Sequence, residues 1–111
     1  TLFEQGLQLS RYHSAFITAN LGYTYFLQGD RSTALKYYQE AWQEDPQYSL
    51  THYYGALWEW EAQNWEQAKK RIDQAISIYP KDQRYKQALA GIEQHQPITV
   101  AAKKNFTFIK M

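Results

Sequence analysis

Residues 34–41 of the chain read ALKYYQEA, and Pro46 follows five residues later. Residues 68–75 read AKKRIDQA, with Pro80 at the same distance. Four pairs therefore match in identity or apolar character at a constant offset of 34 residues: Ala34/Ala68, Tyr38/Ile72, Ala41/Ala75 and Pro46/Pro80. Four matches at one offset indicate an internal repeat and not a coincidence.

Apolar residues recur at helical spacing within each unit. Ala34, Tyr38 and Ala41 lie at i, i+4 and i+7, which is one face of a helix. A second such face spans residues 15–26 and ends at Gly29, a residue that readily closes a helix. Because proline cannot continue the backbone hydrogen-bond ladder, the second helix of each unit ends before its proline. Each unit is therefore predicted to be a helix–turn–helix.

These residues resemble the tetratricopeptide repeat (TPR) family, whose units carry Leu-Gly and Tyr in the first helix and Ala, an aromatic and Pro in the second. The first unit fills these positions with Leu21, Gly22, Tyr25, Ala34, Tyr38, Ala41 and Pro46. The second unit departs from the pattern at Gly55, where a large apolar residue is expected, and at Glu59. The resemblance implies an all-α fold, a TPR-type helical-hairpin solenoid whose antiparallel helix pairs stack into a right-handed superhelix.

The repeat divides the chain, read as a single TPR domain over residues 1–111, into successive units. Residues 15–48 and 49–82 form two complete repeats, and 83–111 form a degenerate or truncated third one. In this third unit we expect helices over residues 83–95 and about 99–110, although the second segment also suits a strand. Residues 1–12 look like the second helix of a preceding repeat. Because the chain opens without Met inside an expected helix, we expect it to be part of a larger protein.

Composition excludes several classes of function for this chain. The formal charge is +1, with 12 basic and 11 acidic residues interspersed, so no basic stripe predicts nucleic-acid binding. No apolar run reaches the length of a membrane span, so we expect no direct membrane insertion in this segment. Cysteine is absent, which rules out disulfides and is compatible with both the cytoplasm and the bacterial periplasm.

The sequence offers no constellation that would support catalysis. His13, His52 and His95 are far apart and stand in no metal-binding spacing. Glu59 and Glu61 are two residues apart on an expected helix, so their side chains diverge. The five glycines occur singly and form no phosphate-binding loop. We therefore expect no enzyme, no cofactor and no metal site.

The TPR resemblance implies that the first helices of successive units line a concave groove. The groove residues predicted to bind a partner are Phe16, Asn20, Tyr23, Phe26, Tyr53, Leu57, Trp60 and Arg84. The groove would be aromatic across the first two units and polar towards the third. TPR domains that grip a terminal carboxylate use Lys, Arg and Asn at defined positions, and only Arg84 offers the right charge here, so we do not expect such a clamp.

Two interpretations of these aromatics stay open, because an aromatic stripe on a helix also suits core packing. The preferred function is a protein–protein interaction scaffold that binds a peptide or helix in the groove. The alternative is a non-catalytic appendage of a larger enzyme, transporter or outer-membrane pore, as in bacterial envelope export or assembly. RNA binding by related helical repeats is disfavoured by the near-neutral charge. Self-association through the solenoid ends is compatible with the sequence.

Overall fold

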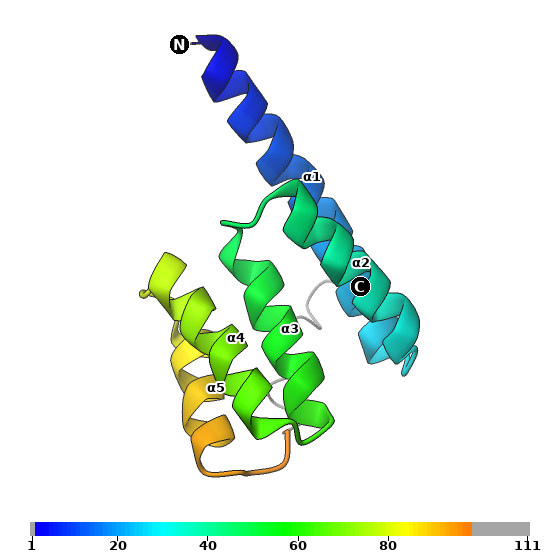
Figure 1. Ribbon diagram of the computed structural model, residues 1–111, viewed down its shortest axis with the longest axis vertical. Coiled ribbons are helices and arrows are strands. Elements are labelled where there is room, and N and C mark those ends of the chain that lie inside the picture. Colours follow the sequence, from blue (N-terminus) through cyan, green and yellow to red (C-terminus); the bar gives the residue numbers. More distant parts are fainter. Residues whose placement is uncertain (1, 99–111) are drawn as a thin grey trace.

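The computed structural model describes residues 2–98 of the chain and consists there of helices joined by short turns (Figure 1). The helices are α1 (Leu2–Leu27), α2 (Arg31–Glu44), α3 (Ser49–Glu61), α4 (Trp65–Ile78) and α5 (Gln83–Glu93). The prediction of an all-α helical-repeat fold is confirmed over this part of the chain. The expected element at about 99–110 lies outside the described residues.

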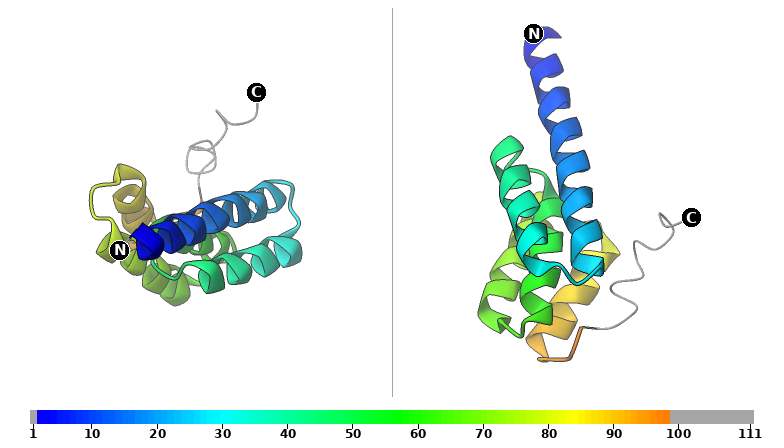
Figure 2. Two further views of the ribbon diagram at one scale, coloured as in Figure 1. Left: turned by 90° about the horizontal axis from the view of Figure 1, so that it is seen from above. Right: turned by 90° about the vertical axis from the view of Figure 1, so that its right-hand side faces the viewer.

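The helices pair as the repeat predicts. α1 packs along α2 and α3 along α4, while α5 packs against α4 and also contacts α3 (Figures 1 and 2). The first helices α1, α3 and α5 contact one another in sequence, and α2 also contacts α3. Each hairpin is therefore held to its neighbour mainly through one shared boundary, which is the nearest-neighbour architecture of a solenoid.

In each of the first two hairpins, one residue in the left-handed conformation ends the first helix, at the same position of the repeat. Gly29 has φ +87° and Gln63, 34 residues later, has φ 63°. In both turns the following amide reaches back to a carbonyl five residues earlier: Asp30 N donates to Tyr25 O and Asn64 N to Glu59 O, each at 2.9 Å. This hydrogen bond is typical of the Schellman motif, in which the left-handed residue is most often glycine.

Small residues set how closely the helices of a hairpin approach. Ala15, Ala19, Ala34 and Ala41 are fully buried between α1 and α2. A Cβ added at Gly22 would lie 2.9 Å from the ring of Tyr38, closer than carbon atoms pack, so only glycine fits there without a shift. Two of these residues, Ala34 and Ala41, recur as Ala68 and Ala75, which are also fully buried, so the repeat in the sequence reflects a repeated close packing of helices.

The expected separate helix over residues 1–12 does not form, because α1 runs without a break from Leu2 to Leu27. Residues 10–14 read SRYHS and include neither glycine nor proline, so nothing in the backbone chemistry interrupts the helix. The amino-terminal part of α1 consequently projects past the end of α2 (Figure 1).

Candidate protein-binding surface

The eight predicted groove residues lie on the first helices α1, α3 and α5, and the structure divides them by exposure. Five are buried: Tyr23, Phe26, Tyr53, Leu57 and Trp60. Asn20 and Arg84 are half-buried, and Phe16 is 46% exposed. We use the name first-helix face for the surface formed by these eight residues.

Stacked tyrosines bury the middle of the first-helix face. Tyr23 on α1 stacks on Tyr54 of α3, with ring centroids 4.5 Å apart and an interplanar angle of 13°. Tyr53 packs against Tyr85 of α5 at 5.0 Å. Such pairs add roughly 0.5–1.5 kcal/mol each beyond the area they bury. The aromatics that the sequence assigned to a groove therefore also join α1 to α3 and α3 to α5.

Two of these tyrosines, Tyr54 and Tyr85, form hydrogen bonds through their phenol groups. Tyr54 Oη donates to Asn20 Oδ1 at 2.7 Å, so the half-buried Asn20 on α1 is held against the buried, stacked tyrosines. Tyr85 Oη lies 3.0 Å from Ser49 Oγ. Burial raises the pKa of Tyr23 and of Tyr54 well above the usual range, because the charged phenolate would lose its hydration. Both buried phenols are therefore uncharged at physiological pH.

Arg84 brings the positive charge of the first-helix face. Its Nε and Nη2 donate to the two carboxylate oxygens of Asp82, at 3.0 and 2.7 Å. The guanidinium also lies 5.6 Å from the Tyr53 ring centroid, within the range of a cation–π contact. The hydrogen bond from Arg84 lowers the pKa of Asp82, which caps the start of α5 through the backbone amide of Arg84. The cation is thus oriented by its own helix cap.

Trp60 lies at the far end of the face and is fixed on both sides. Its Nε1 donates to Gln96 O at 2.6 Å, just past the end of α5. A Cβ added at Gly91 would lie 2.6 Å from the Trp60 ring, so the indole packs directly on the α5 backbone. Truncating Trp60 would open a cavity between two units, which makes it a packing residue whatever else it contacts.

A second cluster, which the sequence did not predict, lies where α2, α3 and α4 meet. Trp42 stacks near His52, with ring centroids 6.3 Å apart, and the guanidinium of Arg71 lies 3.7 Å from the indole centroid. Trp42 enters this position because Gly55 has no side chain: a Cβ there would be 3.1 Å from the indole. The signal was present in the sequence, since Gly55 stands where the family has a large apolar residue.

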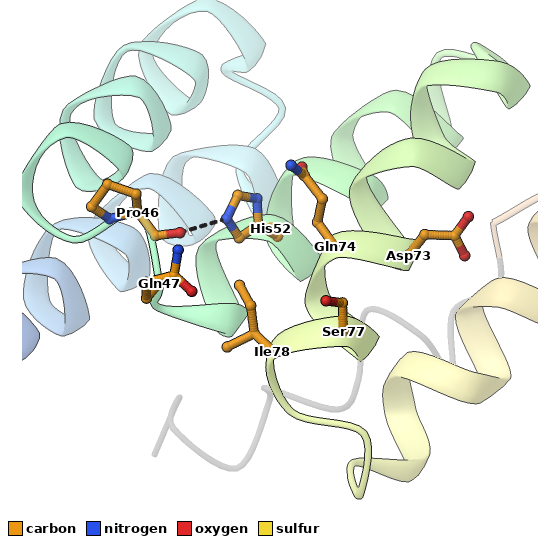
Figure 3. A pocket seen from close by; sticks show the side chains of 7 residues that line it. All are labelled: Pro46, Gln47, His52, Asp73, Gln74, Ser77 and Ile78. Atoms are coloured by element: carbon orange, nitrogen blue, oxygen red, sulfur yellow. Dashed lines mark hydrogen bonds between the residues drawn. The ribbon is translucent and has the colours of Figure 1, made fainter.

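A pocket of about 460 Å³ opens beside this cluster, between the α2–α3 turn and α4 (Figure 3). Its lining brings together His52, Asp73 and Ser77, which are the residue types of a hydrolytic triad. They do not form one: His52 Nε2 donates to Pro46 O at 2.9 Å, and Asp73 accepts from Lys69 at 2.8 Å. Figure 3 shows Asp73 pointing away from the His52 ring. A triad needs its members joined by hydrogen bonds, so this pocket provides no activated nucleophile.

Among residues 2–98, no three His, Asp or Glu side chains gather in a way that would hold a metal ion. Over the same range, none of the helices combines the length and hydropathy that crossing a bilayer requires.

A family model described as tetratricopeptide repeat matches residues 25–92. No curated protein and no solved structure was found to match the chain. The matched range runs from the end of α1 to the last turns of α5 and covers more than half of the 111 residues. With its repeat of 34 residues, its paired helices and this match, the chain belongs to the tetratricopeptide repeat family.

Proposed function

We propose that this protein is an interaction scaffold that binds a peptide or helix of another protein on its first-helix face. Tetratricopeptide repeats generally mediate protein–protein interactions and typically serve as non-catalytic scaffolds. The observation that supports a site on this face is the exposure of Phe16. Its ring is 46% exposed and lies on α1 four residues before Asn20, which is tied to the buried tyrosine ladder.

The ligand chemistry follows from what the face leaves accessible. Phe16 offers an apolar anchor, and Asn20 offers an amide that already accepts from Tyr54 and donates to Phe16 O. Arg84 adds a cation at the other side of the face. An apolar anchor beside oriented polar groups is typical of interface hot spots. We therefore propose a ligand with a large apolar residue that contacts Phe16 and an acidic or carbonyl group directed at Arg84.

The proposed context is a larger polypeptide in which this segment supplies the binding module. No observation on the described residues favours an enzyme, a transporter or a pore as the remainder, so we carry none of these further. In each case the segment itself would act by binding.

The test is a selection from a random peptide library displayed on phage, with the protein immobilised. Enriched peptides are synthesised with a fluorophore, and their Kd is measured by anisotropy against the wild type and Phe16→Ser. We expect Phe16→Ser to weaken binding at least about tenfold, because losing a hot-spot side chain costs more than about 1.4 kcal/mol.

The matched control is Gln39→Ser, an exposed substitution on α2, which should bind like the wild type. Circular dichroism should show that all three proteins are equally helical. Variants at Tyr53 or Trp60 are unsuitable, because truncating such buried aromatics costs about 3–5 kcal/mol and would unfold the site. A library that enriches no peptide, or peptides that bind Phe16→Ser and wild type alike, would refute the proposed site.

A further inference from the structure

The chain leaves α5 by a turn that differs from the turns after α1 and α3. Those two turns have their left-handed residue at Gly29 and Gln63, and the equivalent residue one repeat later is Pro97. Because the proline ring fixes φ at about −65°, Pro97 cannot take the left-handed conformation. His95 takes it instead, with φ 53°, two residues before the repeat position. The third unit therefore does not repeat the turn that leads into α2 and α4.

α5 also lacks the close-packing surface that α1 offers to α2. Gly22 on α1 is buried near Tyr38 of α2, where an added Cβ would lie 2.9 Å from the ring. The equivalent residue on α5 is Ala90, which is exposed, and the exposed Gln87 and Gln94 lie one turn to either side of it. A helix packed there would bury glutamine amides, which costs free energy unless each amide finds a partner. Apolar residues that follow α5 are therefore better buried on another surface.

The last described residues bring the chain to the first-helix face. Trp60 Nε1 donates to Gln96 O at 2.6 Å, and the half-buried Ile98 packs against the core. Figure 1 shows this stretch, in orange, passing from the end of α5 to the lower end of α3. Since Trp60 is one of the eight residues that define the first-helix face, the chain has already reached one end of this face at Ile98.

The sequence after Ile98 has the chemistry that the proposed site requires of a ligand. Residues 99–111 read TVAAKKNFTFIKM and lie outside the described residues. They include Phe106 and Phe108, large apolar residues of the kind proposed to contact Phe16. Their backbone supplies carbonyl groups of the kind proposed to face the cation at the other side of the site. The chain thus carries a candidate ligand for its own first-helix face.

This segment is long enough to reach Phe16 from the Trp60 end of the face. Phe26 has the same repeat position as Trp60, and Phe16 precedes Phe26 by ten residues, or about 15 Å along α1. Neighbouring helices lie about 10 Å apart, so the whole path is roughly 20 Å. Residues 99–106 can span up to about 26 Å. The first phenylalanine of the segment can therefore lie beside Phe16 without any movement of the described chain.

We propose that residues 99–111 bind the first-helix face and compete there with the external ligand. This role rests on the proposed function of the face and gives it an occupant from the chain itself. A tethered segment has an effective concentration of roughly 1 mM, so with a Kd of about 0.1 mM it would occupy the face in about nine tenths of the molecules. An external peptide would then bind about tenfold more weakly than it binds the uncovered face. The segment would thus select for ligands that bind strongly enough to displace it.

A spin label tests the intramolecular contact in the whole chain, which has no cysteine of its own. With a nitroxide on Asn105→Cys, the amide NMR signals of Phe16 and Asn20 should broaden, and that of Gln39 on the exposed side of α2 should not. The same broadening in a mixture of isotope-labelled and spin-labelled molecules would instead reveal contact between two chains. Broadening centred on Gln87 would place the segment along α5, and either of these results overturns the proposal.

Peptide binding measures the competition. The variant is Phe106→Ser/Phe108→Ser in the whole chain, and the matched control is Thr107→Ser. A fluorescent peptide selected against the variant should bind it about tenfold more tightly than it binds the wild type or the control. The variant should also lose the broadening caused by the label, while unchanged amide shifts in α2 and α4 should show that its fold is intact.

The intramolecular contact and the external ligand fail in different ways. Equal peptide affinities for the variant and the wild type overturn the competition and leave the proposed function in place. Broadening at Phe16, with no peptide bound by either protein, refutes the external ligand and leaves the intramolecular contact.

Discussion

At the scale of single residues, one missing methyl group sets the spacing of the first hairpin. We predict that Gly22→Ala destabilises the protein by about 1–3 kcal/mol, because the new Cβ would lie 2.9 Å from the buried Tyr38 ring. Urea unfolding followed by circular dichroism measures this loss. Gln39→Ala, at an exposed helical position, is the control and should change stability by less than about 0.5 kcal/mol. Equal stabilities for Gly22→Ala and wild type would show that Tyr38 can move aside freely.

His52 should make folding stability depend on pH. Burial and the nearby Arg71 guanidinium lower the pKa of its imidazole. Since Nε2 donates to Pro46 O, the second proton would go to Nδ1, which is buried without an acceptor among the described residues. The unfolded chain therefore takes up this proton at higher pH than the folded chain. It follows that stability is full above a pH of about 6.5 and falls as the pH is lowered below it.

His52→Gln isolates this effect, because the glutamine amide can still donate towards Pro46 O but does not titrate. Thermal melting between pH 7.5 and 5 should show a larger decrease in Tm for the wild type than for His52→Gln. Parallel Tm curves for the two proteins would mean that His52 is protonated as easily in the folded chain as in the unfolded one.

At the scale of helices and turns, the two hairpins have a residue of positive φ at the same position, but the residue type differs. Gly29 takes its left-handed conformation without strain, whereas Gln63 takes the same conformation at a cost. We predict that Gln63→Gly stabilises the protein by about 0.5–1 kcal/mol and that Gly29→Ala destabilises it by about 1 kcal/mol. Nothing lies within 4 Å of a Cβ at Gly29, so that loss would reflect the backbone alone. Chemical unfolding of both variants checks the pair, and changes of the same sign would contradict it.

The ends of the helices could be predicted from the sequence wherever the backbone preference of a single residue sets the boundary. Gly29 and Pro46 limit helices by their φ preferences, so the hairpin boundaries follow from local chemistry. The continuity of α1 was missed for the complementary reason. Residues 10–14 neither break nor favour a boundary, and the expected break was inferred from the family pattern alone.

The candidate site could be predicted only in part, because the exposure of each side chain depends on which residues of other helices pack against it. Tyr23 and Tyr53 were predicted to line a groove, whereas their stacking on Tyr54 and Tyr85 is decided by tertiary packing that the sequence does not show. The Trp42–Arg71 cluster escaped prediction for the same reason, although Gly55 marked the space that Trp42 fills. Sequence periodicity gives a helix its faces, and only the assembled units determine how much of a face remains accessible.

At the scale of the whole molecule, the packing of the first helices changes from one unit to the next. On α1, the residues Ala15, Ala19, Gly22 and Phe26 are all buried. The equivalent positions on and just after α5 are Gln83, Gln87, Ala90 and Gln94, and all are exposed. Within the described residues, the third unit therefore carries three exposed glutamines where the first unit has buried small or aromatic side chains.

Arg31 couples the first two units at a second place, from the start of α2. From the start of α2, its Nη1 donates to Trp58 O and to Glu61 Oε1 of α3, each at 3.0 Å, and its guanidinium lies 4.0 Å from the Trp58 ring centroid. We predict that Arg31→Met lowers stability by about 1–2 kcal/mol, the sum of a charged hydrogen bond and a half-exposed cation–π contact. Hydrogen exchange measured by mass spectrometry should show faster exchange in α1 and α2 than in α3 and α4, because the first unit loses its contact with the second.

Lys36→Met is the control. It removes a positive charge from an exposed position of the same helix and should leave the exchange pattern unchanged. If Arg31→Met instead accelerated exchange equally in all four helices, the two units would unfold as one, and the coupling between them would not depend on this junction.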